Sequence, residues 1–122
     1  MAYTAEIAEC NKELSKKERV MYKNASDCKR LDEVTTKTGS VRIKPEIWLV
    51  LNVHNDKANN PDYTQYIIVD KDGTAYLTGS ENFWANFKTI AEEMEGEEFE
   101  VEVYRKPSKN FNGKDFLTCK LV

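Results

Sequence analysis

Residues 41–55 read VRIKPEIWLVLNVHN, a run rich in β-branched and aromatic residues that Pro45 interrupts once. This composition predicts a long strand, because such side chains pack well on a pleated surface. Proline donates no backbone hydrogen bond, so Pro45 marks an edge or a bend. Beyond Pro45, Leu49, Leu51 and Val53 alternate with more mixed neighbours, which is typical of a strand.

The elements after this strand follow from equally local signals. Residues 63–70 and 74–79 predict two strands that form a hairpin through the Asp-Gly turn at residues 71–73. Ser80 is a typical N-cap for a helix. The apolar face of that helix recurs at helical spacing at Phe83, Phe87, Ile90 and Met94. Gly96 then stands where a C-cap glycine is expected. Strict alternation over residues 98–105 and the apolar end at 116–122 predict two further strands.

This order of elements predicts the fold class. Three strands, a helix and two strands match a mainly β, five-stranded OB-fold barrel of Greek-key type, with one helix between strands 3 and 4. We expect residues 41–122 to form this OB-fold domain.

Residues 1–40 are polar and contain few aromatics, and we expect an N-terminal extension that is partly helical or mobile. Ile7, Cys10 and Leu14 recur at helical spacing. Ser15 and Glu18 fit a capping box for a second short helix that starts at Lys16. A strand through residues 19–23 is the alternative.

The composition limits the class of protein. The chain has 122 residues, about one domain, and no apolar run near the ~20 residues that a membrane span needs. Its first residues resemble no signal peptide, and its three widely spaced cysteines suit a reducing compartment. We therefore expect a cytoplasmic protein with no membrane association.

The net charge of −3 is unevenly distributed. Residues 81–102 contain one Lys and eight Glu, whereas residues 103–122 contain five Lys or Arg and one Asp. Since a phosphate backbone responds to the charge of the face that it contacts, the acidic total does not exclude nucleic acid as a partner.

Catalytic signals are weak. His54 is the only histidine and has no diagnostic motif around it, and a lone histidine is more often structural or simply exposed. The sequence contains no CxxC zinc pattern and no phosphate-binding glycine loop. We expect a protein that is not an enzyme and has no cofactor and no metal.

Cations and aromatic side chains that could bind single-stranded nucleic acid lie on the predicted β-strands and in the basic loop of residues 106–115. Proteins bind single-stranded nucleic acid with cations along the phosphate backbone and with aromatic rings on which the bases stack. Trp48 can be a core residue or a stacking residue, with the core favoured, and the two central-hairpin tyrosines can face either way. Phe111 is the most informative candidate, because its neighbours in KNFNGK offer no buried alternative. The candidates are Arg42, Lys44, Trp48, Tyr66, Tyr76, Arg105, Lys106, Lys109, Phe111, Lys114 and Phe116.

Residues 69–94 (VDKDGTAYLTGSENFWANFKTIAEEM), followed by EFEVEVYRKPSKNFNGKDFLTCKLV, resemble small single-stranded DNA-binding proteins of tailed phages that infect Gram-positive bacteria. The distinctive part is Ser108–Phe116, and the resemblance covers residues 41–122. It implies an OB-fold that coats single strands without sequence preference, with Lys109, Phe111, Lys114 and Phe116 as candidate binding residues. Cellular homologues recruit partners through an acidic C-terminal tail, and since residues 116–122 predict a strand, we expect no such recruitment here.

We therefore expect a non-sequence-specific single-stranded DNA-binding protein that acts in phage DNA replication or recombination in the host bacterial cytoplasm. Phage or host replication proteins are further expected partners. The alternative is a phage protein-interaction module that binds a host or replisome protein through the same fold. Convergence of the basic residues with aromatics favours the first, and pairing of the basic residues with glutamates favours the second.

Overall fold

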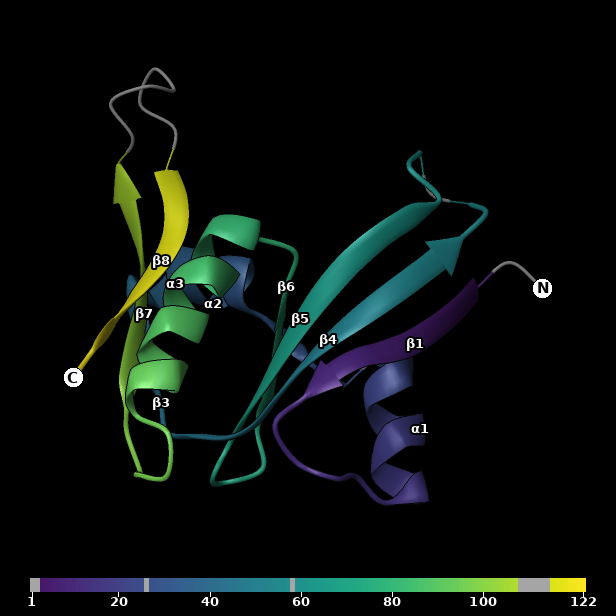
Figure 1. The fold of residues 1–122 in the computed structure, drawn as a ribbon. Coiled ribbons are helices and arrows are strands. Elements are labelled where there is room, and N and C mark those ends of the chain that lie inside the picture. The colour runs from purple at the N-terminus through teal and green to yellow at the C-terminus, as the bar shows by residue number, and fades with distance from the viewer. Residues whose placement is uncertain (1–2, 26, 58, 108–114) are drawn as a thin grey trace.

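Residues 40–55 form two consecutive strands that belong to different sheets in the computed structural model (Figure 1). The structure describes residues 3–25, 27–57, 59–107 and 115–122. Their elements, in chain order, are β1 (Tyr3–Cys10), α1 (Lys16–Asn24), β2 (Lys29–Arg30), α2 (Leu31–Thr38), β3 (Ser40–Ile43), β4 (Pro45–Asn55), β5 (Asp62–Asp70), β6 (Ala75–Thr78), α3 (Glu81–Glu93), β7 (Val101–Pro107) and β8 (Asp115–Leu121).

The two sheets share the bent segment at Pro45. One sheet has the order β1-β4-β5-β6-β2, and the other has the order β3-β7-β8. All neighbours are antiparallel except β2 and β6, which are parallel. β3 pairs with β7, and after the bend β4 pairs with β1 and β5, with an irregular register between Pro45 and Ile47. The bend predicted at Pro45 is therefore confirmed, and it carries the chain from one sheet to the other.

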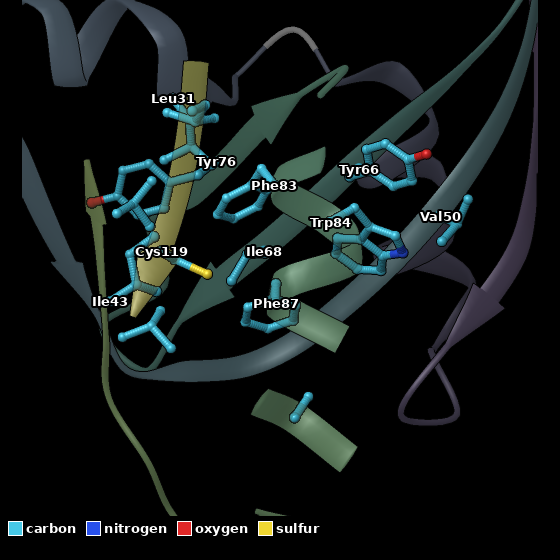
Figure 2. Close-up of a cluster of buried hydrophobic side chains, with 14 residues drawn as sticks. Leu31, Ile43, Val50, Tyr66, Ile68, Tyr76, Phe83, Trp84, Phe87 and Cys119 are labelled. Atoms are coloured by element: carbon cyan, nitrogen blue, oxygen red, sulfur yellow. The ribbon is translucent and has the colours of Figure 1, made fainter. Parts of the chain in front are cut away.

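A first core lies between the two sheets and contains the apolar face of α3. Phe83 and Phe87 are fully buried there, as the helical spacing predicted. Figure 2 shows them among side chains of both sheets, including Ile68 of β5 and Cys119 of β8. Beside them, the edge strand β8 is covered by α3, because the Asn86 amide nitrogen donates to the Cys119 carbonyl oxygen at 2.6 Å.

A second core lies on the opposite face of the larger sheet. Leu49 and Leu51 of β4 and Ile67 of β5 are fully buried on this side, beneath Tyr22 of α1 and Leu14 just before it. Successive residues of a strand point to opposite faces, so β4 and β5 contribute to both cores in turn. This explains why the apolar alternation at residues 47–53 is mixed rather than strict.

Most expectations for residues 41–122 are confirmed at the level of elements. The structure is mainly β, the hairpin of β5 and β6 turns at residues 71–74, and Gly73 has the positive φ of 92° that such a turn favours. Ser80 caps α3 by accepting a hydrogen bond from the Phe83 N–H. The helix ends at Glu93, and Gly96 adopts a positive φ of 84° in the turn that follows it.

Two features of the structure differ from the expected fold. The five-stranded OB-fold barrel is not confirmed, because the described strands lie in two sheets and no pairing joins β6 to β8. The described residues also form α2, a helix that the sequence did not predict, besides α3 and the helix that starts at Lys16. β6 and β8 do not pair because both edges are occupied: β2 pairs with the edge of β6, and α3 covers the edge of β8.

Residues 3–40 contribute the strands β1 and β2 to the larger sheet and apolar side chains to both cores. β1 pairs along β4, and Leu31 of α2 is fully buried in the first core. The helix suggested by Ile7, Cys10 and Leu14 is wrong, because residues 3–10 form a strand. Its register shifts between Ile7 and Glu9, and this bulge returns Cys10 to the face of Ile7, which imitates helical spacing. The helix from Lys16 is confirmed, with both hydrogen bonds of the capping box, so the alternative strand at residues 19–23 is excluded.

Candidate nucleic-acid interface

The β7–β8 hairpin presents a cation and a ring side by side at the end that leads to residues 108–114. Lys106 lies directly opposite Phe116, and the next pair on that face of the hairpin is Tyr104 and Thr118. Lys106 is exposed and Phe116 is half-buried. Phe116 alternates with the buried Leu117 of the first core, so it lies on the other face of β8. This position can offer a positive charge and an aromatic surface to one ligand.

Arg105 points to the opposite side and is held by the protein itself. Its Nη1 lies 3.2 Å from Oδ1 of Asp32 in α2, and its Nη2 donates to the Asp115 carbonyl oxygen at 3.4 Å. The side chain is about a quarter exposed. The guanidinium therefore links α2 to the β7–β8 hairpin, and the structure shows a packing role for this predicted binding residue.

Arg42 and Lys44 lie near the bend. Arg42 is exposed on β3, opposite Glu102, and its Nη1 lies 3.9 Å from a Glu100 carboxylate oxygen. Glu102 in turn lies 3.7 Å from Nζ of Lys120 on β8. Positive and negative side chains thus alternate across this sheet. Lys44 is exposed, and its backbone N–H donates to the Asp70 carboxylate at 3.3 Å.

The three aromatic candidates of the larger sheet pack within or against the first core. Trp48 is half-buried and packs edge-on against Phe87, with ring centroids 5.6 Å apart. Tyr66 is 7% exposed and stacks on Trp84 at 4.8 Å (Figure 2), while Tyr76 is 8% exposed. Burial raises the pKa of both tyrosines.

The rings of Tyr66 and Tyr76 are buried, so of the two orientations open to these tyrosines the structure shows the one that packs in the core. For Trp48, the structure favours the core role over the stacking role. Three further candidates, Lys109, Phe111 and Lys114, lie outside the described residues.

Tyr104 is an aromatic residue that the sequence did not single out. It is half-buried on the same face as Phe116, and Nζ of Lys120 lies 5.5 Å from its ring centroid. The signal was present in the sequence: Tyr104 alternates with Val101 and Val103, which the pattern predicted to be buried. It extends the surface of Lys106 and Phe116 along the hairpin.

His54 lies at the end of β4 between two carboxylates. Its Nδ1 is 2.7 Å from Oδ1 of Asp62, and its Nε2 is 2.5 Å from Oδ1 of Asp56. These hydrogen bonds raise the pKa of His54. Within the described ranges, no group of three His, Cys, Asp or Glu side chains is arranged to hold a metal ion.

Comparisons with family models, with curated proteins and with solved structures found no match to this chain. In the part of the chain that the structure describes, no helix has both the length and the apolar character of a membrane span.

Proposed function

We propose that this protein binds single-stranded DNA without sequence preference and acts in phage DNA replication or recombination. The observation that carries the proposal is the cross-strand pair of Lys106 and Phe116. An exposed ammonium beside a half-buried ring supplies the two groups that single-strand binding uses, phosphate neutralisation and base stacking. The pair flanks the segment that contains Lys109, Phe111 and Lys114 in the sequence.

The connectivity of residues 40–121 supports an open barrel of the OB type. The consecutive strands β3 and β4 carry the chain from one sheet to the other, a hairpin of β5 and β6 follows them, and a helix precedes a final hairpin. OB-folds bind oligonucleotides with loops between strands 1 and 2 and between strands 4 and 5. In Figure 1, the β4–β5 hairpin and the β7–β8 hairpin extend toward the same side of the molecule.

The test is a titration of labelled oligo-dT with the whole chain, followed by fluorescence anisotropy at about 50 mM and about 200 mM salt. We expect binding that weakens steeply with salt, because phosphate contacts release counterions. Lys106→Ala should reduce the slope of log affinity against log salt by about one. Phe116→Ala should remove a stacking contribution of ~1–3 kcal/mol.

Lys17→Ala is the control for lost charge, because Lys17 is exposed on α1, away from the β7–β8 hairpin. It should bind like the unchanged chain. If the unchanged chain does not bind oligo-dT at micromolar concentration in low salt, the proposal is wrong.

A specific observation supports the second candidate, a protein-interaction module. Arg42 and Arg105 face Glu100 and Asp32, so two of the predicted binding cations are near carboxylates of the same chain. A protein partner could then use the glutamate-rich segment of residues 97–102, which leads into β7, as its contact surface. Charge reversal at Glu98 and Glu100 would weaken such an interaction, whereas it would strengthen the attraction of DNA.

A further inference from the structure

A groove on the outer face of the larger sheet lies beside the C-terminal end of α1. Its volume is about 540 Å³. Leu51 of β4 and Leu77 of β6 line it, together with the polar side chains of Tyr3, Arg30, Tyr63 and Gln65. These residues come from five strands that are neighbours in one sheet.

Strand register brings these side chains to one face. Leu51 pairs with Gln65 of β5, and Leu77 pairs with Arg30 of β2, so each pair shares a face of the sheet. Tyr63 lies two residues before Gln65 and therefore points the same way.

The end of α1 leaves this part of the sheet face open. The helix ends at Asn24, and Ala25 reverses the chain with a positive φ of 56°. The Tyr3 hydroxyl donates to the Lys23 carbonyl oxygen at 3.3 Å, which links β1 to the last turn of the helix. Tyr3 remains 37% exposed, so its ring is accessible at the margin of the groove.

The groove differs in its charge from four other hollows of the described surface. None of its lining residues is acidic, and Arg30 supplies a cation. Each of those four hollows has at least one Asp or Glu in its lining. In a chain with a net charge of −3, a groove without carboxylates is suited to an anion.

The remaining groups of the groove favour a flat, hydrogen-bonding ligand. Two tyrosine rings can stack on a heteroaromatic ring, and the Gln65 amide can both donate to and accept from its edge. Arg30 can contact a phosphate with two parallel N–H donors. From this set we infer that the groove binds a nucleotide unit, with the base against Tyr3 and Tyr63 and the phosphate at Arg30.

This inference rests on the proposed function, since it adds a second contact for the same ligand class. The unit can belong to a DNA strand or to a free nucleotide. Two probes distinguish these sources: dTMP and oligo-dT, each added to the isotope-labelled whole chain and followed by amide NMR spectra. We expect both probes to shift the amide signals of Arg30, Tyr63 and Gln65.

Substitutions provide a second measurement. Tyr63→Leu keeps the apolar body of the side chain and removes the ring, and it should weaken oligo-dT binding about 5- to 150-fold. Arg30→Gln should also weaken it and lower the salt dependence. Arg19→Gln, which removes an exposed arginine of α1 outside the groove, is the control and should change neither.

The outcomes separate this inference from the proposed function. If oligo-dT binds but the groove signals do not move and Tyr63→Leu binds normally, the groove is not a nucleotide site and the proposed function stands. If dTMP shifts the groove signals but oligo-dT does not bind, the groove is a nucleotide site and single-strand binding is wrong. If neither probe moves these signals, the inference is overturned.

Discussion

His54 shows how two neighbouring carboxylates determine the charge of one side chain. A neutral imidazole has one N–H, and an ionised carboxylate can only accept. Because Asp62 and Asp56 lie within 2.7 Å and 2.5 Å of the two ring nitrogens, only the imidazolium can donate to both. The raised pKa of His54 follows from these two hydrogen bonds.

We predict that NMR titration of the single histidine will give a pKa above the ordinary value of 6.5. The hydrogen bonds favour the protonated form in the folded state. Their contribution to stability is therefore fully present below pH 6.5, and it is lost as the pH rises through the raised pKa. Asp62→Asn should lower the pKa toward the ordinary value. A titration at or below 6.5 in the unchanged chain would contradict the two contacts.

The candidate site could be predicted from the sequence only in part. Alternation separates the two faces of a strand, but it identifies the buried face only when the other face is polar. β5 and β6 are buried on both faces, so the sequence did not reveal that Tyr66 and Tyr76 belong to the core that contains α3. The ion pair of Arg105 could not be predicted from its neighbours in sequence, because its partner Asp32 lies far away in α2.

Individual elements were predictable where the signal was local. The capping box at Ser15 and Glu18 involves residues three apart, and α1 begins where the box predicts. β1 was missed because its identity depends on pairing with β4, a strand far along the chain. Its bulge then disguised a strand pattern as a helix pattern.

We predict that Ser15→Ala lowers the free energy of unfolding by about 1 kcal/mol, because the Glu18 N–H loses its side-chain acceptor. Chemical denaturation of the whole chain measures this difference. Ser15→Asn should keep the stability nearly unchanged, since asparagine is an equally good N-cap. Equal losses for both substitutions would argue against the capping role.

At the scale of the whole molecule, the larger sheet needs cover on both faces. α3 and the smaller sheet cover one face, and α1 with Leu14 covers the other. The sequence predicted the order of the elements in residues 41–122, but it did not predict that residues 3–40 add the strands β1 and β2 to the larger sheet. Pairing between distant segments is what the local patterns could not reveal.

We predict that a chain of residues 41–122 alone will expose the apolar face of Leu49, Leu51 and Ile67, which are fully buried in the whole chain. It should bind the dye ANS and lose dispersion in its amide NMR spectrum. The whole chain under the same conditions is the control. A well-dispersed spectrum and cooperative unfolding of residues 41–122 would show that they fold independently.

The bend at Pro45 also has a consequence for the order of folding. β4, β5 and β6 are close in sequence and pair as neighbours, so their hairpins can form soon after these residues are synthesised. β3 pairs with β7, and residues 101–104 emerge from the ribosome much later. Since contacts between distant segments form slowly, we expect β3 to remain unpaired until the C-terminal part of the chain is complete.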